Sequence, residues 1–417
     1  MNQASIKSSA GRLIRLPFYL LQIFTCAKSF RDNPVIGSKL LNVLGLHVAR
    51  VVIAALMTKI RYLFLAPLMD KTERESFRQN GYLLIENYLP QENFNALNAE
   101  VRAMSDVQVR QCVQGDTLTQ RVLLDEAVVD SLPVCNELVN NSEFLDRLKY
   151  TSARNNSPIF YVQRIKSNAR DAEPDPQRLL HSDTFHSTMK AWLFLDEVGD
   201  HNGAFTYVPG SHKLSLKRLK WEYKMSIEGC SQANSYGSRG SLRVADDELA
   251  SMGMGKPAVF NVPANTLVIA DTHGFHRRGA ASEVSSRLEI WAYSRTNPFN
   301  PLVGFNLQWY KKLTHLVIHR YLERQDKIAE AKGRPASWHL IDSSEMFESV
   351  EETGEPDSPE SDISGSDISG SDLPGSDIPE SDISVSDISG LDTSEPDSSE
   401  SPRPDSDKVE SEQIKVA

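Results

Sequence analysis

The chain has 417 residues, 40% of them hydrophobic, which is enough for one large globular core or two modest ones. Its net charge of −11 is unevenly spread, because residues 349–417 hold 20 acidic and three basic residues, a net −17, so that the first 348 residues carry +6. The four cysteines lack CxxC spacing, which argues against a zinc cluster or a disulfide framework and favours a reducing cytoplasm, and no basic cluster with interleaved aromatic residues supports nucleic-acid binding.

Residues 1–70 are predicted to form a basic, amphipathic helical segment. Between Met1 and Leu68 the only acidic residue is Asp32. Two apolar stretches lie in this segment, at 16–24 and 40–57. The first is too short to cross a bilayer and the second is interrupted by polar and charged side chains, so neither is expected to span a membrane.

The polar residues of this segment fall on one side of a helix. At roughly 100° per residue they occupy an arc of roughly 140°, with Leu, Val and Ile elsewhere. These residues are Lys39, Asn42, His47, Arg50 and Arg61. Two interpretations stay open: the helix lies in a membrane interface through residues 10–65, its basic face toward anionic head groups, or it packs on the chain's own core. The expected location is therefore cytoplasmic, with peripheral membrane association as one alternative.

A folded domain is predicted over residues 71–345. The order helix, strand, helix is expected over 71–81, 82–89 and 90–104, since Gly81 and Pro90 mark the boundaries. From 157 to 297, short apolar runs separated by Gly, Pro, Asn and Asp indicate an antiparallel sandwich or barrel. The helical pattern of 307–333 is expected to pack outside it. The fold class is thus mainly β with flanking helices.

Residues 346–417 are predicted to be a disordered acidic tail. They contain a five-residue Ser-Asp repeat in which a single isolated Ile per unit cannot bury enough surface to offset the chain entropy. The spacing does not match the EF-hand or glycine-rich calcium repeats, so an ion-organised structure is not expected.

The segment "HSDTFH" at 181–186 suggests a metal site. On a strand, His181 and Asp183 would point to the same side. A third ligand is available after the apolar run "NTLVIAD", where His273 and His276 lie in a glycine-containing turn. Two imidazoles and one carboxylate form the facial triad of non-haem iron(II), which leaves positions for a 2-oxo acid and dioxygen. We take His181, Asp183 and His276 as the ligands, with His186 and His273 as competitors.

Arg287 is the candidate clamp for the distal carboxylate of the 2-oxo acid. It follows His276 by eleven residues, and a guanidinium can bind a carboxylate through two parallel hydrogen bonds. A structural alternative is specific here, because Arg287 and Glu289 would share a strand face and could simply pair with each other. Gln163, on an earlier strand, is a further candidate for cofactor or substrate binding, or else a buried amide whose hydrogen bonds are satisfied.

The sequence resembles the phytanoyl-CoA dioxygenase family over roughly residues 74–297. The resemblance rests on "FRQNGYLLIENYL", "HSD", "LFLDEV" with "NGAFTYVPGSH", and the histidine and arginine eleven apart in "HRRGAASEVSSR". It implies a double-stranded β-helix (jelly roll, cupin-like), with iron(II) on His181, Asp183 and His276, and 2-oxoglutarate on Arg287.

One position departs from the family pattern. Family members often carry a small hydroxyl residue two positions after the second histidine, where it shares the cofactor carboxylate, and this chain has Arg278 there. We expect Arg278 to take over part of that contact or the turn to face outward.

The predicted function follows from the triad and the resemblance. We expect an iron(II)- and 2-oxoglutarate-dependent dioxygenase that uses dioxygen to hydroxylate an unactivated C–H bond of a small or lipid-like substrate, releasing succinate and CO2. The retained Asp183 argues against a halogenase. The alternative is a catalytically silent β-helix that acts as a membrane-associated interaction module.

Overall fold

The computed structural model describes residues 15–231 and 235–347. The chain falls into two units, Met1–Ser384 and Val385–Ala417, and every described residue lies in the first. The predicted tail lies outside the described residues apart from its first two positions. Met346 is fully buried in helix α14, so the folded part continues slightly past the predicted boundary.

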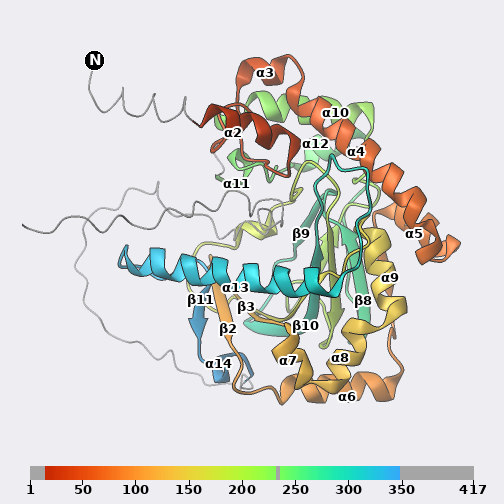
Figure 1. Ribbon diagram of the computed structural model, residues 1–417, viewed down its shortest axis with the longest axis vertical. Coiled ribbons are helices and arrows are strands. Elements are labelled where there is room, and N and C mark those ends of the chain that lie inside the picture. Colours follow the sequence, from red (N-terminus) through yellow and green to blue (C-terminus); the bar gives the residue numbers. More distant parts are fainter. Residues whose placement is uncertain (1–14, 232–234, 348–417) are drawn as a thin grey trace, which may run out of the picture. The chain divides into compact units, whose positions relative to one another are not determined.

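Runs of helices and runs of strands follow one another along the described chain (Figure 1). The strands are β1 (Tyr82–Ile85), β2 (Val109–Gln114), β3 (Thr117–Leu123), β4 (Ile159–Ser167), β5 (Met189–Phe194), β6 (Phe205–Tyr207), β7 (Ala258–Val259), β8 (Thr266–Asp271), β9 (His276–Arg278), β10 (Ser285–Ser294) and β11 (His339–Ile341). The α-helices are α2 (Leu16–Leu21), α3 (Lys39–Val43), α4 (Leu46–Leu65), α5 (Lys71–Asn80), α6 (Gln91–Arg102), α7 (Glu126–Asp130), α8 (Pro133–Asn140), α9 (Ser142–Thr151), α10 (Leu216–Ile227), α11 (Ser235–Ser238), α12 (Asp246–Met252), α13 (Gln308–Glu330) and α14 (Ser344–Phe347). Short 3-10 turns are η1 (Gln22–Phe24), η2 (Ala66–Leu68), η3 (Pro176–Arg178) and η4 (Gly229–Ser231).

Two antiparallel sheets form the centre of the domain. The larger has eight strands in the order β1-β8-β5-β10-β4-β3-β2-β11, and the smaller has three in the order β7-β6-β9. Aromatic side chains from both sheets, among them Trp192, Trp291, Phe205 and Tyr207, pack into one apolar cluster between them. This arrangement confirms the predicted fold class, a mainly β domain with flanking helices.

Strand β10 shows why its sequence is apolar on both faces. Alternate side chains point to opposite sides of a strand. Leu288, Ile290 and Ala292 therefore face the core shared with helices, whereas Trp291 and Tyr293 face the space between the sheets. Arg287 and Glu289 belong to this second set, so the charged residues of β10 are directed into the interior between the two sheets.

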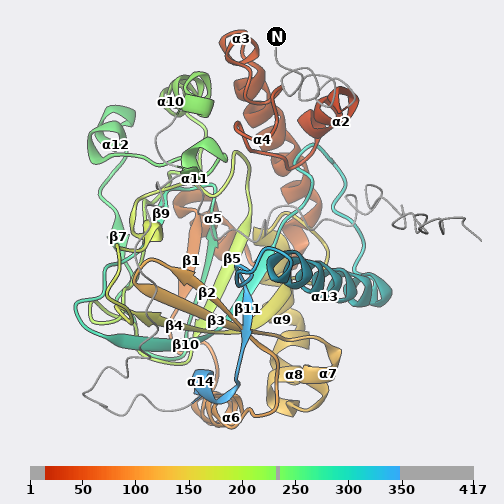
Figure 2. The same ribbon diagram turned by 90° about the vertical axis from the view of Figure 1, so that its left-hand side faces the viewer.

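Helices cover the outer face of the larger sheet. Leu97 of α6, Leu138 of α8 and Leu148 of α9 are buried in one core with Leu193 of β5 and Ile290 of β10. Figures 1 and 2 show α6, α7 and α8 gathered at the lower end of the domain and α2, α3, α4 and α10 at the upper end.

Several predicted elements are confirmed. Helix α5 ends where expected, because Gly81 takes a φ of +87° and the chain then enters β1. Helices α6 and α13 lie within the predicted 90–104 and 307–333. Strands β2 and β3 and helices α7, α8 and α9 lie between residues 105 and 158, for which no element was predicted; β2 and β3 extend the larger sheet beside β4.

The interpretation of a head-group-facing polar arc on the N-terminal helices is wrong for four of its five residues, whereas the fifth, Lys39, is exposed. Asn42, His47, Arg50 and Arg61 are at most 4% exposed and point into the protein. His47 bonds to Glu222 of α10 at 2.9 Å, and Arg50 donates to the carbonyls of Ile23, Thr25 and Ala27. The packing alternative is confirmed for this face. The charged groups turn inward because they find partners there, which leaves the apolar side of the helix outside.

Candidate metal centre and substrate cavity

His181, Asp183 and His276 converge, as the sequence predicted. One nitrogen of each imidazole and one oxygen of the carboxylate all lie within 4.8 Å of one another. His276 begins β9, but His181 is held by isolated bridges and Asp183 lies in a bend, so the expected regular strand under the first two ligands is wrong. The chain reaches the same geometry through backbone pairing of the His181 segment with β9.

Backbone carbonyls orient both imidazoles. The Nδ1 atom of His181 lies 2.8 Å from the Leu179 carbonyl, and that of His276 lies 2.9 Å from the Gly274 carbonyl. Since a carbonyl can only accept, each Nδ1 carries the proton and each Nε2 keeps its lone pair. The two Nε2 atoms lie 3.5 and 3.6 Å from the same oxygen, Oδ1 of Asp183.

This donor set fits a divalent metal ion. Without a cation, two imidazole lone pairs would face a carboxylate oxygen in a buried place, which is unfavourable. Burial, followed by the neighbouring His276 and Arg243, lowers the pKa of His181 to about 3, so the ring is neutral and able to bind metal at neutral pH. Two imidazoles and one carboxylate are the ligand set of non-haem iron(II) oxygenases.

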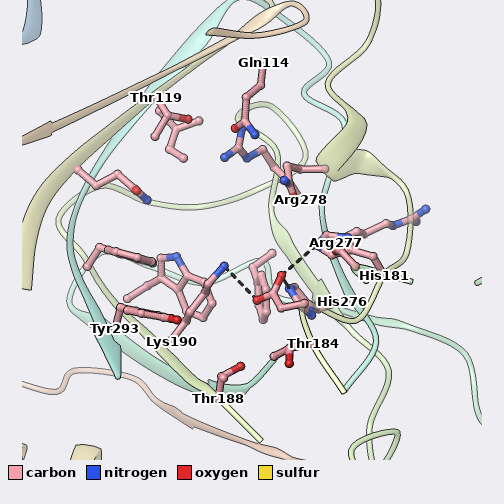
Figure 3. Close-up of a pocket in the computed structure, with 18 of the residues that line it drawn as sticks. Gln114, Thr119, His181, Thr184, Thr188, Lys190, His276, Arg277, Arg278 and Tyr293 are labelled. Atoms are coloured by element: carbon pink, nitrogen blue, oxygen red, sulfur yellow. Dashed lines mark ion pairs between the residues drawn. The ribbon is translucent and has the colours of Figure 1, made fainter. Parts of the chain in front are cut away.

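Two lysines contact the third ligand. Lys190 of β5 lies 3.0 Å from Oδ2 of Asp183 (Figure 3), and Lys28 donates to the Asp183 carbonyl at 2.8 Å. Burial alone would raise the pKa of Asp183, but Lys190 and then His276 hold it well below its usual value. The carboxylate is therefore ionised and has one oxygen on Lys190 and the other directed at the imidazoles.

The triad lies in the wall of a cavity of about 160 Å³. Figure 3 shows Gln114 and Thr119 on one side of this cavity and Thr184 and Thr188 on the other. Among the described residues that line it, Asp183 is the one acidic side chain. The cations in its lining are Lys28, Arg121, Lys190, Arg277, Arg278, Arg287 and Arg295. The cavity is thus strongly electropositive.

Arg287 lines the cavity, but it already has partners. Its Nε lies 3.2 Å from Oε2 of Glu289, and its Nη1 donates to the carbonyls of Asn202, at 2.8 Å, and Gly203. The structural alternative foreseen for this residue, pairing with Glu289, is therefore present. These contacts fix the guanidinium at the cavity wall, and they also neutralise part of its charge.

The other two candidate cofactor residues are also engaged. Arg278 donates to Oδ2 of Asp175 at 2.6 Å. Gln163 accepts a hydrogen bond from Arg121 at 2.6 Å and donates to Glu289. Both line the cavity, so the structure brings all the predicted site residues to one place, with Glu289 and Asp175 as acidic partners behind them.

The competing histidines do not join the metal group. His186 and His273 are buried, and their Nδ1 atoms lie 3.0 Å from the Ser187 carbonyl and 2.9 Å from the Thr184 carbonyl. Neither belongs to the cluster of convergent ligand atoms. Both stabilise the segment between the ligands.

Sequence reasoning missed the lysines. Lys190 is the only charged residue in "MKAWLF", two positions before the cavity-lining Trp192, and a lone cation facing the interior of an apolar strand was a usable signal. Lys28 gave no such signal, because it lies 155 residues from the aspartate it contacts.

Comparisons with known proteins identify a family for the part of the chain that contains His181 and Asp183. Residues 77–244 match the family model described as phytanoyl-CoA dioxygenase (PhyH). The match confirms the predicted family and, with it, the prediction of a 2-oxoglutarate-dependent oxygenase. No curated protein matches the chain.

Three similar solved structures are the following proteins. The non-haem alpha-ketoglutarate-dependent epimerase SnoN from nogalamycin biosynthesis is 18% identical, with 55% of this chain and 83% of that one covered and a TM-score of 0.35. HygX from Streptomyces hygroscopicus, with nickel and 2-oxoglutarate bound, is 15% identical, with 55% and 88% covered and a TM-score of 0.35. AviO1 from Streptomyces viridochromogenes Tue57 is 18% identical, with 55% and 96% covered and a TM-score of 0.32.

Proposed function

Residues 77–244 belong to the phytanoyl-CoA dioxygenase family, and from that premise we propose an iron(II)- and 2-oxoglutarate-dependent dioxygenase that hydroxylates an unactivated C–H bond of a small or lipid-like anionic substrate. The convergence of His181, Asp183 and His276 at the wall of a cationic cavity supports this proposal. When bound there, iron(II) would activate dioxygen, the oxidant of the reaction: 2-oxoglutarate would be oxidised to succinate and CO2 with one oxygen atom, and the other would enter the substrate as its hydroxyl group.

The protein itself positions the metal-binding atoms and the cofactor, and it excludes water from part of the cavity. The carbonyls behind His181 and His276 keep both Nε2 atoms directed at the metal position. Arg287, fixed by the Asn202 and Gly203 carbonyls, is the residue proposed to receive the distal carboxylate of 2-oxoglutarate. Trp192 and Phe205, whose ring centroids lie 4.5 Å apart, form an apolar part of the wall and keep water away.

The charge of the cavity favours an anionic second substrate. Of its seven cations, Arg287 and Arg278 have the carboxylates of Glu289 and Asp175 as partners, and Lys190 has Asp183. These three carboxylates and the two negative charges of one bound 2-oxoglutarate sum to five, against seven cations in the lining. A carboxylate or phosphate on the substrate would suit this cationic lining, because opposite charges attract more strongly where water is partly excluded.

The Arg287–Glu289 ion pair is the observation that favours the silent-module alternative. A clamp whose charge is already compensated binds a carboxylate less strongly than a free one. The alternative predicts that the chain neither binds 2-oxoglutarate nor consumes oxygen.

Succinate release tests the proposal. Purified protein with iron(II), 2-oxoglutarate and ascorbate should be offered matched pairs: a fatty acid and its methyl ester, and a phosphate monoester and its parent alcohol. The proposal expects oxygen-dependent succinate release stimulated by at least one anionic member and not by its neutral partner. Succinate release stimulated by the neutral members alone would contradict an anionic substrate. Succinate release no greater than that of an Asp183→Ala variant would favour the silent module.

A further inference from the structure

The outward side of the N-terminal helices is apolar. Helix α4 together with η2 is, by length and composition, the one element of the described residues that could cross a membrane. Its inward side holds Arg50 and Arg61, whose guanidinium groups bond to backbone carbonyls of this same protein. Those bonds fix α4 against the domain, so it does not cross a bilayer while they are made.

Six large apolar side chains of this segment are between 66% and 76% exposed. They come from the end of α2 and from η1, α3 with its cap, and the last turn of α4. We call them the apolar face: Leu21, Phe24, Leu40, Leu44, Leu63 and Phe64. Apolar patches of this kind on soluble domains mark sites of protein or membrane interaction.

The inverted arrangement of α4 shows that the exposure is not a random scatter. At about 100° per residue, the exposed Val52, Leu56 and Leu63 fall on one side of the helix, and the buried His47 and Arg61 fall on the opposite side. A helix that only covered its own domain would bury the apolar side and expose the polar one. In α4 the polar side instead contacts the rest of the protein, and the apolar side is available to contact a membrane or another protein.

The charges around the apolar face indicate what kind of partner binds it. Arg15, Arg31, Lys39 and Lys59 are exposed within or beside it, while Asp32 is the one exposed acid of the described residues from 15 to 69. Lysine and arginine at the edge of an apolar surface can reach anionic head groups while the apolar residues enter the acyl boundary. A second copy of this chain would instead bring four like charges toward one another.

We propose that the apolar face docks this protein on the surface of a membrane that contains anionic lipids. Lys28, within the same segment, contacts Asp183 and lines the cavity. The docking segment therefore supplies one residue of the cavity wall. The docking itself does not depend on iron, 2-oxoglutarate or turnover.

Vesicle co-sedimentation of the full chain tests this proposal. Vesicles of phosphatidylcholine with one quarter phosphatidylglycerol should bind the protein, and vesicles of phosphatidylcholine alone should bind it more weakly. A Leu63→Glu, Phe64→Glu double variant should lose at least about tenfold in partition, since both side chains would enter the acyl boundary. Raised salt should reduce the extra binding to the vesicles that contain phosphatidylglycerol, and it should leave the binding to phosphatidylcholine alone unchanged.

Leu340→Glu is the matched control. Leu340 is also exposed and apolar, but it lies on β11, away from α2, α3 and α4 in both views (Figures 1 and 2). This variant should bind vesicles as the unmodified chain does, and Asp183→Ala should also bind, which separates docking from catalysis. Absence of vesicle binding, or equal loss in Leu340→Glu, would overturn the proposal; so would a dimer in light scattering that the double variant dissociates.

Discussion

The main chains of His181 and His276 exchange two hydrogen bonds: the His181 N–H donates to the His276 carbonyl at 3.0 Å, and the His276 N–H donates to the His181 carbonyl at 2.9 Å. Residues 95 positions apart in sequence are thereby held as direct neighbours in a β-bridge. The metal-binding geometry is built into the backbone pairing of the domain and does not depend on flexible side chains alone.

The turn before His276 should tolerate no side chain at Gly274. A Cβ there would meet the Tyr207 hydroxyl, which donates to the Asp271 carbonyl, and the Gly274 carbonyl orients the His276 ring. We expect Gly274→Ala to weaken iron(II) binding by about 10- to 100-fold, as disturbed carbonyl support of a ligand does. Gly255→Ala is the control, because nothing lies near its Cβ position, and isothermal titration would measure both. Equal affinities in the two variants would contradict this role.

Arg287→Lys should affect 2-oxoglutarate more than turnover at saturation. The planar fork is held by Asn202 and Gly203, and a lysine cannot keep these contacts and also bind a carboxylate with two hydrogen bonds. We expect the KM for 2-oxoglutarate to rise at least about tenfold with a smaller change in kcat. Arg147→Lys, at an arginine that forms an ion pair with Glu73 and does not line the cavity, should leave this KM unchanged. A variant of Arg287 with normal KM would move the clamp elsewhere in the cavity.

The buried pair between α4 and α10 should contribute strongly to stability. Glu222 is 1% exposed and binds both His47 and Arg218, and Arg218 is itself fully buried. Glu222→Ala leaves that guanidinium uncompensated, so the free energy of unfolding should fall by about 3–5 kcal/mol. Glu228→Ala at the exposed end of α10 should change it by less than about 0.5 kcal/mol. Urea unfolding followed by circular dichroism would compare them, and similar midpoints would refute the prediction.

The metal-free protein should lose stability in mild acid. Burial lowers the pKa of His212 to about 3 and of His273 to about 4, from 6.5. The unfolded chain takes up these protons below about pH 6.5 and the folded chain does not, so stability falls as pH decreases from 6.5 toward 4. Burial raises the pKa of Asp271 to about 6, which acts in the opposite direction between pH 6 and 3.8.

Burial also lowers the pKa of His181 to about 3, and the three histidines outweigh this one carboxyl group, so the expected net loss between pH 7 and 4.5 is on the order of 6 kcal/mol. Urea unfolding in the presence of EDTA at several pH values would measure it, and His212→Gln should flatten the dependence. A free energy of unfolding that stays constant or rises over this range would show that these histidines are protonated in the folded state.

The sequence predicted the convergence of His181, Asp183 and His276 because the signals are local: the HxD spacing and a histidine after a buried strand. Arg287 and Glu289 were placed on one strand face by the period of two, and they share it. Periodicity could not tell which face of α4 is buried, since the partner of His47 is Glu222, 175 positions away. For the same reason the contact of Lys28 with Asp183 gave no sequence signal; long-range packing decides such contacts.

The most direct test of the metal centre is an anaerobic titration of the purified protein with iron(II) and 2-oxoglutarate, followed by visible absorption. We predict a charge-transfer band of the iron-bound 2-oxoglutarate that saturates at one equivalent, stays in His186→Gln and is lost in Asp183→Ala. A chain that stays colourless and binds no iron(II), or an Asp183→Ala variant that gives the same band, would contradict it.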